Sequence, residues 1–177
     1  GVFRRQRQMC IRDRYIIECL DSILKQNGLF KMEIVWINDG SNELESKLLE
    51  KTLKEFEIKM RWTNIIYKKL DKNIGIGPAL HIGVELCNNE IVMKVDSDDI
   101  IKNDRFYKQI KFMKTHHDCV LCGSNLTMFK NIDNKMINMG DTKHKEILTW
   151  EEFKKNPSHW FTSCLLYTSD AADERLR

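Results

Sequence analysis

The chain has no apolar stretch of about 18 residues, so no membrane-spanning helix can be read from its sequence. Its basic N-terminal residues are not followed by the apolar segment of a signal peptide. Proline is scarce, with two residues among 177, and no repeat or low-complexity linker divides the chain. A hydrophobic content of 42% with 31% charged residues excludes a disordered composition. The length therefore favours one domain with its own core.

The two ends of the chain differ from the residues between them. Arg4–Arg14 reads RRQRQMCIRDR and Cys164–Glu174 reads CLLYTSDAADE, and neither has the periodicity of a helix or strand. Met9–Asp13 can be encoded by a nucleotide sequence whose reverse complement, read in a frame shifted by one base, encodes Leu165–Thr168. This complementarity indicates a sequencing adapter translated once in each orientation, not a natural basic tail and acidic tail. We therefore expect three segments: non-native tails over 1–14 and 164–177, and a partial domain of a larger protein over 15–163.

These tails account for the apparent basic character of the chain. The sequence has 29 basic and 26 acidic residues, and seven of the basic and four of the acidic ones lie in the tails, so the remainder is balanced. An argument from basic charge for a nucleic-acid partner therefore fails, and none is expected. Four cysteines remain, without the paired spacing of a disulfide framework, and they favour a reduced, cytoplasmic setting. They are Cys19, Cys87, Cys119 and Cys122.

Hydrophobic periodicity predicts alternating helices and strands between the tails. Helices are expected over 15–27, 42–58, 78–88, 103–116 and 150–155, and strands over 32–37, 64–68, 90–95, 119–124 and 126–129, with 136–139 as a further partner. This alternation is typical of an α/β fold with a mostly parallel sheet flanked by helices. Ligands bind such sheets outside the carboxyl ends of the strands, so the turns at these ends are the candidate sites.

An acidic turn follows the strand expected over 90–95. Asp96-Ser97-Asp98-Asp99 places three carboxylates within four residues. Each pair of like charges at about 4 Å costs roughly 4 kcal/mol at an effective dielectric constant near 20. A divalent cation would relieve this repulsion, because hard cations take carboxylate oxygens. The alternative is a solvated acidic turn in which Asp99 caps the following helix.

Two further polar turns lie earlier in the chain. Asp39-Gly40-Ser41 ends the strand expected over 32–37, and its carboxylate could accept an N–H from a nucleobase; ordinary turn chemistry is the alternative. Asn73–Ala79 is a glycine-containing loop that enters a helix, with Pro78 in its first turn. Its backbone amides and the helix dipole could face a diphosphate, and a plain loop is the alternative.

Taken together in this order, the motifs resemble the inverting family 2 glycosyltransferases of the GT-A fold. The resemblance is carried by Ser22–Gln26, Glu33–Ser41, Asn73–Gly83, Glu90–Asp99 and Asn103–Arg105. It implies a partial, Rossmann-like GT-A fold without its first strand and its C-terminal part. It also implies transfer of a sugar from a nucleotide-diphosphate-sugar donor, most simply a UDP-sugar, to a saccharide or lipid-linked acceptor.

The resemblance assigns roles to individual residues. Asp39 would bind the nucleobase, Asp96 the ribose or sugar of the donor, and Asn73 and Gly75 belong to the same nucleotide site. Asp98 would coordinate Mg²⁺ or Mn²⁺, which bridges the diphosphate and acts as a Lewis acid. The acidic catalytic base is expected beyond the fragment and stays unassigned. The fragment alone is therefore expected to bind nucleotide without turnover.

The chain departs from the family pattern at several positions. Asn38 replaces the first aspartate of the D-D-G-S motif, and Leu80-His81 replaces an Arg-Asn pair near the diphosphate. His81 would either donate to the diphosphate or pack within its helix. Asn156–His159 resembles a segment that lines the acceptor side in some members. Trp160 and Phe161 would stack on a sugar or belong to the core.

Three other interpretations compete with this one. The first is a nucleotidyltransferase acting on sugar phosphates, and the second is a non-catalytic nucleotide-binding α/β domain in which Asp96–Asp99 is a surface turn. The third concerns His116-His117-x-Cys119-x-x-Cys122, which has the letters of a zinc site, although buried thiols in an apolar strand are favoured. For the main hypothesis, a cytoplasmic location is expected, with peripheral association at the inner face of the membrane through segments outside this chain.

Overall fold

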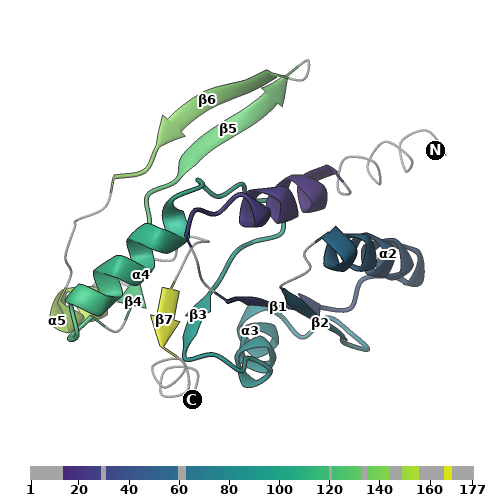
Figure 1. Ribbon diagram of the computed structural model, residues 1–177, viewed down its shortest axis with the longest axis horizontal. Coiled ribbons are helices and arrows are strands. Elements are labelled where there is room, and N and C mark those ends of the chain that lie inside the picture. The colour runs from purple at the N-terminus through teal and green to yellow at the C-terminus, as the bar shows by residue number, and fades with distance from the viewer. Residues whose placement is uncertain are drawn as a thin grey trace.

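The computed structural model describes residues 14–28, 31–59, 63–119, 121–132, 135–143, 149–155 and 166–168. Helices and strands alternate along these residues, as the periodicity predicts (Figure 1). The order is a helix over 14–24, β1 (Glu33–Asn38), α2 (Glu43–Lys59), β2 (Asn64–Lys69), α3 (Ile76–Glu85), β3 (Ile91–Met93), α4 (Arg105–Thr115), β4 (Leu121–Cys122), β5 (Thr127–Ile132), β6 (Lys135–Asp141), α5 (Trp150–Lys155) and β7 (Leu166–Thr168). In this described part, no helix is long and apolar enough to cross a membrane.

Within the described ranges, the strands form three small sheets. β1 and β2 pair in parallel, from Glu33 opposite Asn64 to Asn38 opposite Lys69, with α2 as the crossover between them. β3, β7 and β4 form an antiparallel sheet in that order, and β5 and β6 form an antiparallel hairpin. The α/β class is therefore confirmed, while parallel pairing among the described residues is confined to β1 and β2.

β7 lies between β3 and β4 and pairs with both. It belongs to the segment 164–177, which we expected to be a non-native tail outside the domain. Leu-Tyr-Thr has the composition of a strand, and such a segment can pair with exposed strand edges whatever the origin of its codons. That origin stays a prediction, which the genomic sequence around these codons would test.

Helices cover the strands on two sides. Figure 1 shows the helix over 14–24, α2 and α4 on one side of β1, β2 and β3, and α3 on the other. The alternation of side chains along β1 agrees with this arrangement, because Ile34 and Trp36 pack toward the first side while Ile37 lies 3.3 Å from the position of a Cβ at Gly83 of α3. Both faces of β1 are therefore covered.

The core lies between the helix over 14–24 and the strands. One cluster joins Cys19 and Ile23 to Phe106 of α4 and to Ile101. A second joins Leu20 to α2, through its buried residues Leu49, Leu53 and Phe56. The N-terminal helix thus connects the half of the fold that carries β1 to the half that carries β3. The apolar residues of α2 face this core except at its first turn, where Leu44 is 62% exposed.

Two residues of the N-terminal helix that contribute to the family resemblance hold the segment after β3 in place. The buried Ser22 hydroxyl donates to the Cys19 carbonyl at 2.7 Å and accepts the N–H of Ile101 at 3.1 Å. The Gln26 side chain donates to the Lys102 carbonyl at 2.8 Å and accepts the N–H of Phe106 at 3.0 Å. These contacts fix the chain that leaves the acidic turn.

We expect Ser22→Ala to lower the free energy of unfolding by about 1–3 kcal/mol, because it leaves the buried N–H of Ile101 without its acceptor. Urea denaturation followed by circular dichroism measures this change. Ser97→Ala, at an exposed position, serves as the control and is expected to stay within about 0.5 kcal/mol of the parent chain. Equal stability of the two variants would contradict the role assigned to Ser22.

Candidate functional site

Asp39 joins the turn after β1 to the loop after β2. Its Oδ1 accepts the N–H of Ile74 at 2.8 Å, and its Oδ2 accepts the N–H of Gly75 at 3.1 Å. The Gly75 N–H also lies 3.1 Å from Oδ1 of Asn73. Three residues of the expected nucleotide site, Asp39, Asn73 and Gly75, are therefore brought together by direct hydrogen bonds.

The backbone of the two loops allows this close approach. Gly40 has a φ of 75°, and a Cβ at this position would lie 2.3 Å from the backbone nitrogen of Asn73. Only glycine fits such a contact without a shift of the backbone. Gly75, with a φ of 90°, caps α3 without a side-chain hydrogen bond. The amides of Ile76 and Gly77 belong to the first turn of α3, where N–H groups have no intrahelical acceptor.

Asn38, which departs from the family pattern, is a buried structural residue. Its Nδ2 donates to the Ser46 hydroxyl at 3.0 Å and to the Tyr67 hydroxyl at 2.8 Å. Its Oδ1 accepts the N–H of Ser41 at 3.0 Å. An amide can donate and accept at once, which an ionised carboxylate cannot do. Asn38 thereby ties the end of β1 to α2 and β2 and shapes the turn that presents Asp39.

The acidic turn after β3 forms a second group. The backbone carbonyl of Asp96 accepts the N–H of Asp99 at 3.0 Å and lies 3.5 Å from Sγ of Cys19. The Asp96 carboxylate pairs with the Lys94 ammonium at 2.5 Å, and the Asp98 side chain is exposed. The expectation for Asp99 as a helix cap is not met, because the residue at the N-terminal end of α4 is Asp104.

Lys94 is the residue that the sequence analysis missed. The repulsion within Asp96–Asp99 is reduced by a cation that the chain itself supplies. A signal was present, because positions 94 and 96 of an extended segment fall on the same side of the backbone. The charge argument for a metal ion, which considered the carboxylates alone, was therefore incomplete.

The donor set of the turn fits Mg²⁺ or Mn²⁺ only in part. Asp98 offers an exposed carboxylate, which is a hard oxygen ligand. Over the ranges that the structure describes, no group of three or more His, Cys, Asp or Glu side chains is placed to hold a metal ion. This fits a cation bound through one or two carboxylates and completed by substrate phosphates and water, and it does not fit a cage made by the protein alone.

The zinc interpretation is not supported. The His116 ring stacks on Phe112 with centroids 4.0 Å apart, and Cys119 and Cys122 are free. Burial raises the pKa of the Cys122 thiol, and the nearby Cys119 adds to the effect, so the thiolate needed for a metal bond is disfavoured. The preferred alternative, buried thiols, is met only in part, because Cys119 and Cys122 are half-buried.

His81 lies away from the loop that it was considered to serve. Its Nε2 is 3.4 Å from Oε1 of Glu85, one turn further along α3. The pair points along the helix, away from the N-terminal end where a diphosphate would lie. The acceptor-side segment Asn156–His159 and the aromatic residues Trp160 and Phe161 lie outside the described residues.

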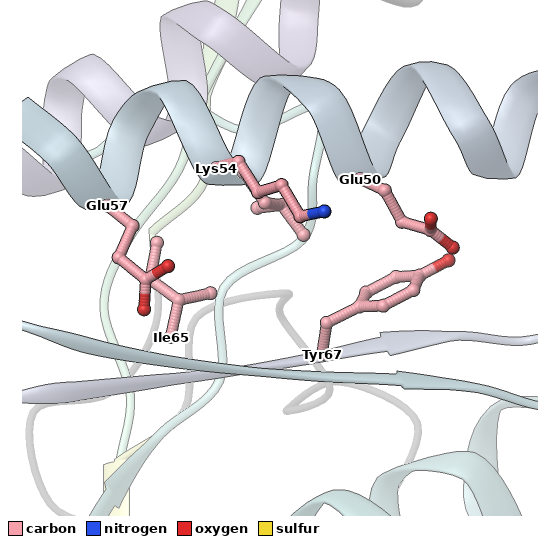
Figure 2. A pocket seen from close by; sticks show the side chains of 6 residues that line it. Glu50, Lys54, Glu57, Ile65 and Tyr67 are labelled. Carbon is pink, nitrogen blue, oxygen red and sulfur yellow. The ribbon is translucent and has the colours of Figure 1, made fainter.

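A shallow groove runs between α2 and β2. Figure 2 shows Glu50, Lys54 and Glu57 projecting from α2 toward Ile65 and Tyr67 of β2. The Tyr67 hydroxyl is already bonded to Asn38. The groove lies along the flank of the sheet and not at the carboxyl ends of its strands, so it is separate from the two groups above.

Comparison with known proteins identifies the relatives of the chain. The family model described as Glycosyl transferase family 2 matches residues 9–175. The amylovoran biosynthesis glycosyltransferase AmsE of Erwinia amylovora is 30% identical over 86% of this chain and 54% of its own length. The UDP-Gal:alpha-D-GlcNAc-diphosphoundecaprenol beta-1,3-galactosyltransferase of Escherichia coli is 32% identical over 66% of this chain and 40% of its own length.

Among solved structures, the crystal structure of S. aureus TarS 1-349 superposes with a TM-score of 0.55 at 20% identity, covering 92% of this chain and 45% of that one. This likeness confirms the fold. The chain spans about half the length of the curated relatives that it matches, with 54% of the first.

Proposed function

Because the chain belongs to glycosyltransferase family 2, we propose that it carries the donor-binding part of an enzyme that transfers a sugar from a UDP-sugar, with inversion and with a divalent cation. The observation that carries the proposal is the contact of Asp39 with the loop before α3. It joins the residue expected to recognise the base to the loop that leads into α3, whose next amides, those of Ile76 and Gly77, are expected to face the diphosphate. No observation favours the nucleotidyltransferase alternative.

Asp39 is proposed to bind the base while it holds the loop. An ionised carboxylate has about four lone-pair sites, and the amides of Ile74 and Gly75 use two of them. A remaining site accepts the N3–H of uracil. Cytosine has no hydrogen on N3, so this contact favours uridine nucleotides.

The remaining donor contacts follow from the two groups. The amides of the first turn of α3 and its dipole stabilise the negative diphosphate. Asp96 is proposed to accept a hydroxyl of the ribose or sugar, and Asp98 to hold Mg²⁺ or Mn²⁺. When bound there, the cation neutralises charge on the departing nucleoside diphosphate. The base that deprotonates the acceptor is expected outside the described residues.

The acceptor is proposed to be a saccharide or a lipid-linked glycan. The name of the E. coli relative describes a galactosyltransferase that acts on a diphosphoundecaprenol-linked sugar. An acceptor of this kind would bring the intact protein to the inner face of the membrane. The acceptor and the membrane location are both proposed for the intact protein, on the basis of its family.

The base assignment is tested by titrating the chain with UDP and CDP in the presence of Mn²⁺. We expect UDP to bind roughly ten- to a hundredfold more tightly, since a hydrogen bond to a charged group contributes roughly 1.5–3 kcal/mol. Asp39→Asn is expected to abolish this preference, because its amide can donate to N3 of cytosine. A variant that only loosened the loop would weaken the binding of both nucleotides and leave the ratio of their affinities unchanged. Equal binding of UDP and CDP by the parent chain would contradict the assignment.

A further inference from the structure

Lys94 places a covered positive charge beside the acidic turn. Its ammonium lies 2.5 Å from Oδ1 of Asp96, and its side chain is 15% exposed. By comparison, the basic partners of the surface pairs Lys51–Glu55 and Lys108–Asp104 are 74% and 71% exposed. The Asp96 side chain is 36% exposed, so the pair is partly shielded from water and retains more of its electrostatic interaction than these surface pairs do.

The backbone around Lys94 fixes the side on which its ammonium lies. Met93 and Val95 pack against the core cluster that contains Cys19 and Phe106, while Val92 packs against Val84 of α3. Side chains two residues apart in an extended segment point to the same face. Lys94 therefore points toward the α3 side, as Val92 does. Its carbonyl accepts Nη2 of the buried Arg105 at 3.4 Å.

This placement affects two ligands in opposite directions. A positive charge held at Asp96 repels a divalent cation approaching Asp98, two residues further along the same turn. The same charge attracts the diphosphate of a nucleotide, which is negative. A residue that only supported the shape of the turn would affect both ligands in the same direction.

We propose that Lys94 is a positioning residue that acts as the built-in counter-ion of the acidic turn. It holds Asp96, weakens the binding of a divalent cation alone and strengthens the binding of a nucleoside diphosphate. The turn thereby favours cation and nucleotide together over the cation alone. The predicted effect on nucleotide binding rests on the proposed function. The predicted effect on cation binding depends only on the charges of the turn.

The experiment compares the 177-residue chain with Lys94→Met, Lys94→Arg and Lys51→Met. Mn²⁺ alone is titrated by the electron paramagnetic resonance signal of the free ion, and UDP is titrated by calorimetry in the presence of EDTA. Circular dichroism and thermal melting verify that each variant is folded. Lys51→Met removes a surface ion pair of α2 and is the matched control.

In Lys94→Met, we expect Mn²⁺ to bind roughly three- to tenfold more tightly and UDP to bind more weakly by a similar factor. Lys94→Arg and Lys51→Met are expected to keep both affinities within about twofold. Weakening of both ligands in Lys94→Met, or unchanged Mn²⁺ binding, would overturn the proposal. A parent chain that does not bind UDP would contradict the proposed function, while the Mn²⁺ titration would still decide the role of Lys94.

Discussion

Asp98→Ala is expected to abolish the part of nucleotide binding that depends on Mn²⁺. The parent chain should bind UDP at least about tenfold more tightly with Mn²⁺ than without it, because a cation held by Asp98 would attract the negative diphosphate. Without the exposed Asp98 carboxylate, the two affinities should coincide. Calorimetric titration of UDP, with Mn²⁺ and with EDTA, measures both values for each variant.

A control separates loss of a ligand from loss of charge. Asp118→Ala also removes one negative charge at an exposed position, outside the acidic turn. It should retain the full enhancement by Mn²⁺. Asp98→Ala that still binds UDP more tightly with Mn²⁺ would show that the cation is held elsewhere, and the assignment of Asp98 would fail.

Gly40→Ala is expected to destabilise the chain by about 3 kcal/mol or more. An alanine at a φ of 75° is strained by roughly 1–2 kcal/mol, and its Cβ would lie 2.3 Å from the backbone nitrogen of Asn73. The turn and the loop must separate to admit the methyl group, which also breaks the contacts of Asp39. Urea denaturation gives the loss of stability, and a titration with UDP gives the accompanying loss of affinity.

Gly77→Ala is the matched control for this substitution. A Cβ at Gly77 meets nothing within 4 Å, and the residue lies in the first turn of α3. Alanine favours the helix over glycine by up to about 1 kcal/mol, so this variant should be as stable as the parent chain or more stable. If Gly40→Ala matched Gly77→Ala in stability, the close approach of the two loops would be wrong.

The sequence predicted the elements well, because their apolar faces are long and regular. α2 buries Leu49, Leu53 and Phe56 at helical spacing, and β1 exposes its two faces to different helices. Leu44 continues the apolar spacing of α2 and is nevertheless exposed, because periodicity does not show where a helix extends beyond the sheet that it covers. The pairing of β7 was not predicted, since strand partners far apart in the chain are set by which edges meet.

The site was predicted to a smaller extent. Motif order indicated Asp39, Asn73 and Gly75, and the structure brings these three together. It did not indicate that both oxygens of Asp39 hold backbone amides, because such contacts depend on two loops meeting in space. Lys94 was missed for a related reason, since a charge argument confined to Asp96–Asp99 omits cations outside that turn. The metal and donor roles stay predictions.

The bonds between Asp39 and the loop before α3 also bear on the thermodynamics of nucleotide recognition. These bonds join residues of the chain itself, so the entropy of ordering that loop is lost during folding. Under the proposed function, a preorganised loop of this kind should bind nucleotide with a small entropic penalty and a fast association rate. Nucleotide affinity and the stability of the apo protein then become linked properties. Selection for a more mobile loop would lower both.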